Sequence, residues 1–302
     1  MPDRRYVIYD VFTTEALAGN PLAVVLDCDG LDTEAMQKIA GEFNLSETSF
    51  VLAPERAPHK ARVRIFTPSY EMPFAGHPTV GTAIALADLD AGDGPELFVL
   101  EENIGPVRCA VRREPEGAFA EFDLPVLSTQ LAFEVEPALV GAALGLGPHE
   151  VSFENHVVSF WSAGVPYVTV PVAGLDAAAR AKLDNAAWAA FGPVDDKGKP
   201  ASVYVYCRDT VGQDNGFHAR MFVPGNPSYE DPATGSAVAA LSGAIVAFDQ
   251  PVDGVTRLWI EQGIEMGRAS RIRLEIEVES GTAVSARIGG NARKIAEGTL
   301  FV

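Results

Sequence analysis

Three residues able to move protons stand at particular places in this chain: Glu47, His77 and Asp231. Glu47 lies in "NLSETSFV" (44–51), between the end of a predicted helix and an apolar strand. Partial burial at a strand start raises a carboxyl pKa toward neutrality, which suits a group that both takes and returns a proton. An exposed loop glutamate is the alternative that the pattern leaves open.

His77 and Asp231 lie in two copies of one pattern. "PSYEMPFAGH" (68–77) and "PSYEDPATGS" (227–236) agree at six of ten positions without a gap. His77 stands where the second copy has Ser236, and Asp231 stands where the first copy has a methionine. A duplication followed by unequal replacement would therefore put an imidazole on one side and a carboxylate on the other. Each residue alone also suits an ordinary helix cap.

The two copies have similar surroundings. Strand-like runs precede them, "ARVRIFTP" (61–68) and "HARMFVP" (218–224). Small, continuously apolar runs follow them, "PTVGTAIALADL" (78–89) and "AVAALSGAIVAF" (237–248). Runs of this kind predict helices buried on nearly all sides. Each half therefore predicts a strand, a turn and a central helix.

The predicted helix starts suit an anion. A helix N-terminus presents unpaired N–H groups and a partial positive charge. Gly76 and Gly235 allow the backbone to approach a ligand closely, and Thr234 and Ser236 add hydroxyl groups. Two such starts could converge on one substrate carboxylate, while simple capping without a ligand remains the alternative.

Composition narrows the possible functions. The 302 residues carry 41 acidic and 23 basic side chains, for a formal net charge of −18, which disfavours nucleic acid and anionic membrane surfaces as partners. The chain start lacks the features of a signal peptide and no apolar run is long enough to span a bilayer, so a cytoplasmic protein is predicted. The three cysteines and five histidines are scattered without a chelating spacing, so no metal site is predicted.

Further elements are predicted around the two copies. Helices are expected at 32–43 and 176–191. A break near 123–128 divides the chain into an N-terminal domain, 1–122 joined by the last strand at 297–302, and a C-terminal domain, 123–296. The other predicted strands are 49–53, 96–102, 202–208 and 271–278.

Several blocks together resemble the phenazine-biosynthesis PhzF family, in family order and nearly end to end. The blocks are "FTTEALAGNPLAVV" (12–25), "NLSETSFV" (44–51), "RIFTPSYEMPFAGHPTVGTA" (64–83), "EDPATGSAVAAL" (230–241) and "IEQGIEMGRAS" (260–270).

The resemblance implies an α+β, diaminopimelate epimerase-like fold: two pseudo-symmetric domains, each a sheet wrapped around a central helix, with the active site in the cleft between them. It implies a homodimer and isomerisation of trans-2,3-dihydro-3-hydroxyanthranilate, or of another small carboxylate, without metal or organic cofactor. Glu47 corresponds to the acid/base, and His77 and Asp231 to residues that hold and polarise the substrate. The neighbouring substrate-binding residues implied are Ser46, Gly76, Thr234, Gly235 and Ser236.

Two other functions stay open. An epimerase or racemase could use Glu47 and His77 as two unlike bases on opposite sides of the substrate. Racemisation by two cysteine thiols is disfavoured, because neither Ala75-Gly76-His77 nor Thr234-Gly235-Ser236 contains cysteine. A metabolite-binding protein without turnover is the alternative outside enzymes. The motifs describe a chemistry and leave the physiological substrate undetermined.

Overall fold

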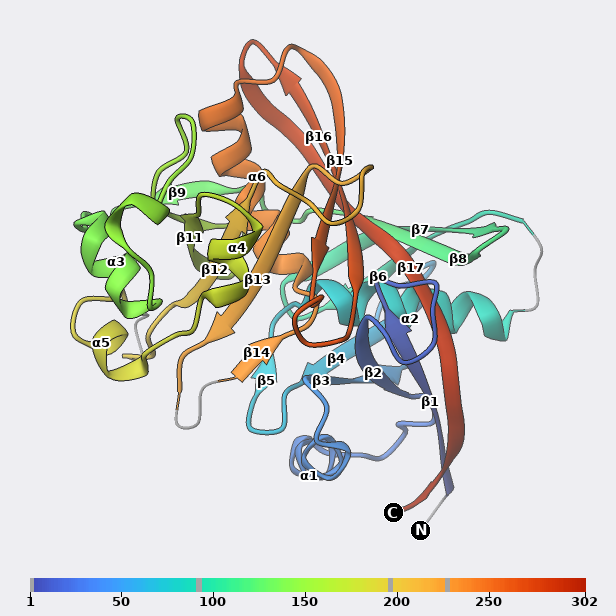
Figure 1. The fold of residues 1–302 in the computed structure, drawn as a ribbon. Coiled ribbons are helices and arrows are strands. Elements are labelled where there is room, and N and C mark those ends of the chain that lie inside the picture. Colours follow the sequence, from blue (N-terminus) through green and yellow to red (C-terminus); the bar gives the residue numbers. More distant parts are fainter. Residues whose placement is uncertain (1–2, 91–93, 195–197, 226–228) are drawn as a thin grey trace. The chain divides into compact units, whose positions relative to one another are not determined.

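The computed structural model shows a mixed α+β chain, rich in sheet and with few helices (Figure 1). Contacts along the chain divide it into two compact units: the first comprises Met1–Pro125 and Ile288–Val302, the second Val126–Arg287. The residues described are 3–90, 94–194, 198–225 and 229–302.

The first unit is built mainly of paired strands. β1 pairs antiparallel with β17 and with β2, β2 runs parallel to β3, and β3 pairs antiparallel with β4. β4 runs parallel to β6, which continues antiparallel through β7 to β8, and β8 also pairs with β17. The elements are β1 (Asp3–Val11), β2 (Asn20–Val25), α1 (Thr33–Phe43), β3 (Glu47–Leu52), β4 (Ala61–Phe66), β5 (Glu71–Met72), α2 (Gly76–Leu89), β6 (Glu96–Glu102), β7 (Gly105–Glu114), β8 (Gly117–Asp123) and β17 (Thr282–Phe301).

Helix α2 is buried along most of its length, which confirms the helix predicted at 78–89. It contacts β1, β2, β3, β7 and β8, and every residue of 76–87 is buried. Its small residues permit this close packing: a Cβ at Gly81 would lie 2.6 Å from Leu22 Cδ2 and 2.8 Å from Val11 Cγ2. The sheet therefore approaches α2 at distances that larger side chains would prevent.

Helix α1 fixes the start of β3, and with it Glu47. Asp32 caps the helix by accepting a hydrogen bond from the N–H of Ala35 (2.8 Å). The helix ends at Asn44, which adopts the left-handed conformation with φ 51°. Its buried face packs Met36 and Ile39 into one cluster with residues of β2, β3 and β4. The helix predicted at 32–43 is confirmed.

The second unit repeats part of this pairing order. β11 runs parallel to β12, β12 pairs antiparallel with β13, β13 runs parallel to β15, and β15 pairs antiparallel with β16. The same sequence of parallel and antiparallel pairs links β2, β3, β4, β6 and β7. The elements are β9 (Thr129–Leu131), α3 (Pro137–Ala143), a 3₁₀ turn (Pro148–Glu150), β10 (Ser159–Ser162), β11 (Pro166–Pro171), α4 (Leu175–Arg180), α5 (Asn185–Ala189), β12 (Ser202–Cys207), β13 (Phe217–Val223), β14 (Tyr229–Asp231), α6 (Gly235–Asp249), β15 (Gly254–Gln262) and β16 (Ser270–Glu279).

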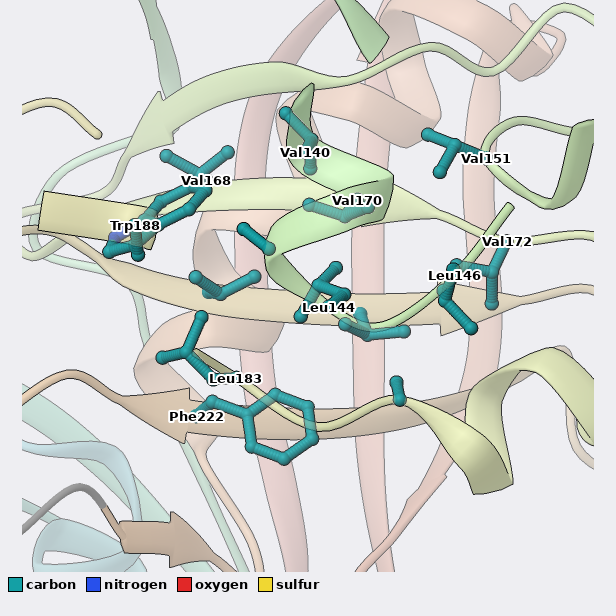
Figure 2. Close-up of a cluster of buried hydrophobic side chains, with 14 of the residues drawn as sticks. Val140, Leu144, Leu146, Val151, Val168, Val170, Val172, Leu183, Trp188 and Phe222 are labelled. Carbon is teal, nitrogen blue, oxygen red and sulfur yellow. The ribbon is translucent and has the colours of Figure 1, made fainter. Parts of the chain in front are cut away.

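A separate apolar cluster supports the central strands of the second unit (Figure 2). Val168 and Val170 of β11 are two residues apart, so both side chains lie on the same face of the strand, where they meet side chains from α3, such as Val140. Trp188 of α5 is fully buried there, and its ring N–H donates to the carbonyl oxygen of Ala201 (3.0 Å). Apart from the first residue of each strand, every residue of β11 and β12 is buried, so both faces of these strands are covered.

Helix α6 corresponds to the helix predicted at 237–248. Its first eight residues are all buried, and it contacts β9, β10, β11 and β16. It has 15 residues. No helix within the described ranges is both long enough and apolar enough to cross a membrane.

One predicted helix is wrong in extent. The run 176–191 forms two short helices, α4 and α5, because the chain leaves the helical conformation at Ala181, where ψ is 131°. Asp184 then starts α5 by accepting hydrogen bonds from the N–H groups of Ala186 and Ala187. In the second copy of the repeated pattern, Pro227 and Ser228 lie outside the described residues.

Candidate active site

Glu47 and His77 lie close together in the first unit. Glu47 opens β3 and His77 is the second residue of α2. Glu47 Oε2 is 3.4 Å from His77 Nε2, and the two side chains are 15% and 4% exposed. A carboxylate and an imidazole are thus held in contact at the edge of the buried region.

Asn20 holds the other side of the imidazole. Its Nδ2 lies 3.4 Å from His77 Nδ1, and the residue is fully buried. The turn before it requires glycine, because Gly19 has φ 64° and a Cβ there would lie 2.3 Å from the carbonyl oxygen of Val11. The first residue of β2 is therefore placed against the first turn of α2.

The imidazole is neutral near pH 7. Burial lowers the pKa of His77 from 6.5 to about 3. The Asn20 amide nitrogen faces Nδ1, an arrangement in which Nε2 would carry the ring proton. Nε2 lies 3.4 Å from Glu47 Oε2 without hydrogen-bond geometry, so the contact is a close approach of a neutral imidazole to a carboxyl group rather than an ion pair.

The start of α2 has no side-chain cap. Its N-cap residue, Ala75, is extended (φ −154°, ψ 139°), and Gly76 is buried. The first N–H groups of a helix have no intrahelical acceptor and carry partial positive charge. Ser46 immediately precedes Glu47 and is half-buried. The first unit therefore gathers a carboxyl group, an imidazole and a helix N-terminus.

The second unit places Asp231 beside the start of α6. Thr234, the N-cap residue, donates its hydroxyl to Asp231 Oδ2 (2.5 Å). The Gln262 amide donates to the carbonyl oxygen of Asp231 (2.7 Å) and to Thr234 Oγ1 (3.1 Å). All three residues are buried. A carboxylate is thus fixed by neutral donors at this helix start.

Ser236 is held by a tyrosine. Its Oγ lies 2.7 Å from the hydroxyl of Tyr167 on β11, and both residues are buried. Gly235, before it, is the first residue of α6 and is also buried. The second helix start therefore presents hydroxyl groups and a carboxylate where the first presents an imidazole and a carboxylate.

The structure adds contacts that motif reading did not single out: Asn20, Tyr167 and Gln262. Asn20 and Gln262 lie inside quoted sequence blocks, and each is a polar residue at the end of a mostly apolar strand. Their partners lie 57 and 28 residues away in the chain. The only sequence signal is that polarity, which does not identify the partner.

One cluster has the residue types of a metal site. The ligand atoms of Glu154, His156 and Asp249 lie within 4.8 Å of one another. Arg208 Nη2 contacts all three, at 3.1 Å from Glu154, 3.3 Å from His156 and 2.6 Å from Asp249. A guanidinium already occupies the point where a cation would sit. Asp249 ends α6, about 20 Å along the helix from Gly235.

Comparison with known proteins identifies relatives over the whole chain. The family model described as "Phenazine biosynthesis-like protein" matches residues 9–298. An "Uncharacterized isomerase" of Mesorhizobium japonicum is 66% identical, with all of both chains covered. The trans-2,3-dihydro-3-hydroxyanthranilate isomerase of Pseudomonas aeruginosa is 35% identical over 99% of each chain. A Bacillus anthracis phenazine biosynthesis protein of the PhzF family has a similar structure, with a TM-score of 0.89, 28% identity and complete coverage of both chains.

Proposed function

This chain belongs to the phenazine biosynthesis-like PhzC-PhzF family and is an isomerase, and we propose that it uses Glu47 to move a carbon-bound proton within a small carboxylate substrate. The family expectation from the sequence blocks is confirmed by the match over residues 9–298. The relative from P. aeruginosa is named for isomerising trans-2,3-dihydro-3-hydroxyanthranilate, which makes that compound the first substrate to test. The proposed reaction requires neither a metal nor an organic cofactor.

The observation that carries the proposal is the contact between Glu47 and a neutral His77. His77 brings an imidazole without positive charge to within 3.4 Å of Glu47, so it does not suppress the basicity of the carboxylate as a cation would. A base that removes a weakly acidic carbon-bound proton must become the acid that returns it. A flexible glutamate at a strand start can reach two neighbouring carbons of one substrate.

The two helix starts supply the binding part of the proposal. In the first unit, the N–H groups near Gly76 would hold the substrate carboxylate, which withdraws electrons and eases loss of the carbon-bound proton. The N–H groups near Gly235 are the corresponding donors of the second unit. Asp231 would accept a hydrogen bond from a substrate amine or hydroxyl. Ser46, Thr234 and Ser236 would serve as neighbouring hydrogen-bonding groups.

We also propose that the two units are copies of one ancestral fold, each a sheet around a central helix. The shared order of strand pairs and the burial of α2 and α6 support this proposal. Domain boundaries at 122/123 and 296/297 and a homodimeric assembly belong to the same proposal.

Epimerisation by Glu47 and His77 is the weaker alternative. Two bases that invert a carbon must stand on opposite faces of it, with room for the substrate between them. Glu47 Oε2 and His77 Nε2 are 3.4 Å apart, which leaves no room for a substrate carbon between them. The geometry favours one base assisted by the imidazole.

The test is turnover of Glu47→Gln, first on trans-2,3-dihydro-3-hydroxyanthranilate and then on a panel of small carboxylates. The amide keeps the shape but cannot ionise, so turnover should fall by about 10²–10⁴-fold while ligand binding and melting temperature are retained. Glu42→Gln makes the same charge change on exposed α1 and should keep wild-type turnover. If Glu47→Gln kept near wild-type turnover, the base would be another residue. If the wild-type protein bound these carboxylates but turned none of them over, a metabolite-binding protein would be favoured.

A further inference from the structure

A second buried carboxyl lies behind the start of α2. Glu102 is the last residue of β6 and is only 6% exposed. Its Oε1 lies 2.8 Å from Thr79 Oγ1, and Thr79 Oγ1 lies 2.7 Å from the carbonyl oxygen of Ala75. These contacts link Glu102 to the N-cap residue of the helix whose first turn contains Gly76 and His77.

The protons in this chain of contacts can be counted. The Thr79 hydroxyl has one proton, and the Ala75 carbonyl can only accept. If Thr79 donates to Ala75, the contact between Thr79 and Glu102 requires a proton on Glu102. Both contacts can then form together, with a protonated Glu102 donating to Thr79 Oγ1 and the Thr79 hydroxyl donating to the Ala75 carbonyl, which also accepts from the Thr79 N–H (3.2 Å). An ionised Glu102 would instead turn the Thr79 hydroxyl away from Ala75.

The surroundings of Glu102 favour the protonated form. Burial raises its pKa to about 8, and the hydrogen bond with Thr79 opposes that rise only in part. Among the described residues, its second oxygen, Oε2, is buried without a hydrogen-bond partner, which costs a carboxylate more than a neutral acid. On neighbouring elements, Cys109 of β7 has a thiol pKa raised by burial and next by Glu102. Asp123 at the end of β8 also raises the pKa of this thiol.

The second unit has a neutral donor at the matching place. Arg62 of β4 pairs with Glu101, and His218 of β13 pairs with Glu261. Glu101 and Glu261 are therefore at equivalent positions, and so are the residues that follow them, Glu102 of β6 and Gln262 of β15. Gln262 donates to the hydroxyl of the N-cap residue of α6 and to a backbone carbonyl just before it. A carboxamide can only act as a neutral group. The protonated Glu102 carboxyl is its closest chemical equivalent.

We propose that Glu102, in its protonated form, is a positioning residue that keeps the start of α2 competent to bind an anion, and that its ionisation weakens this binding. The carbonyl of Ala75 and the N–H of Gly76 belong to one peptide group. A donor on the carbonyl therefore polarises the N–H that would face the ligand. Loss of the Glu102 proton turns the Thr79 hydroxyl away from this carbonyl, which then keeps only the Thr79 N–H as a donor, and adds negative charge behind the site. This inference rests on the proposed function, because the ligand is taken to be the substrate carboxylate.

The experiment measures benzoate affinity by calorimetry from pH 6.5 to pH 9.5. Benzoate remains a monoanion throughout, so its own charge does not change. Wild-type affinity should fall by about tenfold across this range, a typical size for two coupled sites. In Glu102→Gln the ratio of affinities at the two pH values should stay within about twofold. Glu101→Gln, which alters the preceding carboxyl of β6, should retain the wild-type fall.

A second measurement uses the wild-type protein alone, so it does not depend on a variant that folds. A buried neutral carboxylic acid has its own C=O band in the infrared, which should disappear as the pH rises through about 8. Bound benzoate should move that disappearance to higher pH, because coupling between two binding equilibria is reciprocal.

An equal fall in affinity for Glu102→Gln and wild type would overturn the inference, as would a flat wild-type profile or a carboxylic acid band already absent at pH 6.5. Failure of benzoate to bind at any pH would remove the anion site on which the inference depends. The proton-transfer role of Glu47 is judged separately, by turnover at one pH, so either proposal can fail without the other.

Discussion

In each unit, one glutamate accepts hydrogen bonds from the loop that leads into a neighbouring strand: Glu101 for the loop before β4, and Glu261 for the loop before β13. In the first unit, Glu101 of β6 accepts from the backbone N–H groups of Glu55 (2.7 Å) and Arg56 (2.9 Å). Its Oε1 also lies 2.7 Å from His59 Nδ1. One carboxylate at a strand end therefore fastens the loop that leads into β4.

In the second unit, Glu261 of β15 does the same. It accepts from the backbone N–H groups of Val211 (2.6 Å) and Gly212 (2.9 Å), and from the Asn215 amide (2.5 Å). These three donors stand 156 positions after their counterparts in the first unit, as Arg220 stands after Arg64. A scaffold contact has thus been kept in both copies.

The groups next to that contact differ. Glu102 follows the shared glutamate in the first unit and Gln262 follows it in the second; His77 stands at one helix start and Ser236 at the other. At these two positions the first unit has titratable groups and the second has neutral hydrogen-bonding groups, whereas at a third position the second unit has Asp231 and the first has Met72. The two units thus share the contacts that hold these loops and differ in the residues at their helix starts.

Two buried histidines show the same division of tasks. His77 has a pKa lowered to about 3 by burial. His218 is buried too, which lowers its pKa, but its hydrogen bonds to Glu261 and Glu265, each 2.9 Å, outweigh burial and raise it to about 9. A neutral imidazole suits a site that orients a base, and a charged one suits a structural cluster.

The most disruptive way to test the comparison is to make the two helix starts alike. His77→Ser gives the first helix the serine found at Ser236 and removes the imidazole that faces Glu47. Turnover should fall by about 10²-fold or more, the scale of a lost acid/base or orienting group. Ser236→Ala should cost less, because Tyr167 still supplies a hydroxyl nearby. Equal losses in the two variants would contradict the asymmetry.

Acid unfolding tests the neutral state of His77. Its pKa is about 3 in the folded chain and 6.5 ordinarily, so the unfolded chain binds the extra proton between these values. Stability should therefore decline as the pH falls below about 6.5, with a contribution from His77 of up to about 1.4 kcal/mol per pH unit. Urea unfolding of His77→Gln should show a shallower decline. Matching slopes for variant and wild type would mean that His77 is not held neutral.

Alkaline unfolding tests the opposite case. The pKa of His218 is raised to about 9, so the folded chain binds the extra proton above pH 6.5. Its stabilising contribution should be complete below about pH 6.5 and lost as the pH rises through about 9. The free energy of unfolding of His218→Gln should change less over this window than that of wild type. An unchanged alkaline slope would show that the Glu261–His218–Glu265 cluster does not hold a charged histidine.

The helices and most strands could be predicted because their signals are local. The continuous small apolar runs identified α2 and α6, and the apolar strand after "NLSE" placed Glu47 at a strand start. The break between α4 and α5 was missed, because alanine-rich sequence around Lys182 and Leu183 favours helix and only tertiary packing ends it there. The partners of His77, Thr79 and Asp231 come from distant strands, so periodicity could not identify Asn20, Glu102 or Gln262.

The central claim is that one base, Glu47, moves a proton between two carbons of the substrate. The most direct measurement follows the reaction in D₂O by proton NMR, for wild type and Glu47→Gln. For wild type, the account predicts a product in which the carbon-bound hydrogen has moved, and remaining substrate of unchanged configuration. For Glu47→Gln, it predicts no product and no deuterium taken up by the substrate. Deuterated substrate of inverted configuration, or wild-type product formation by Glu47→Gln, would contradict it.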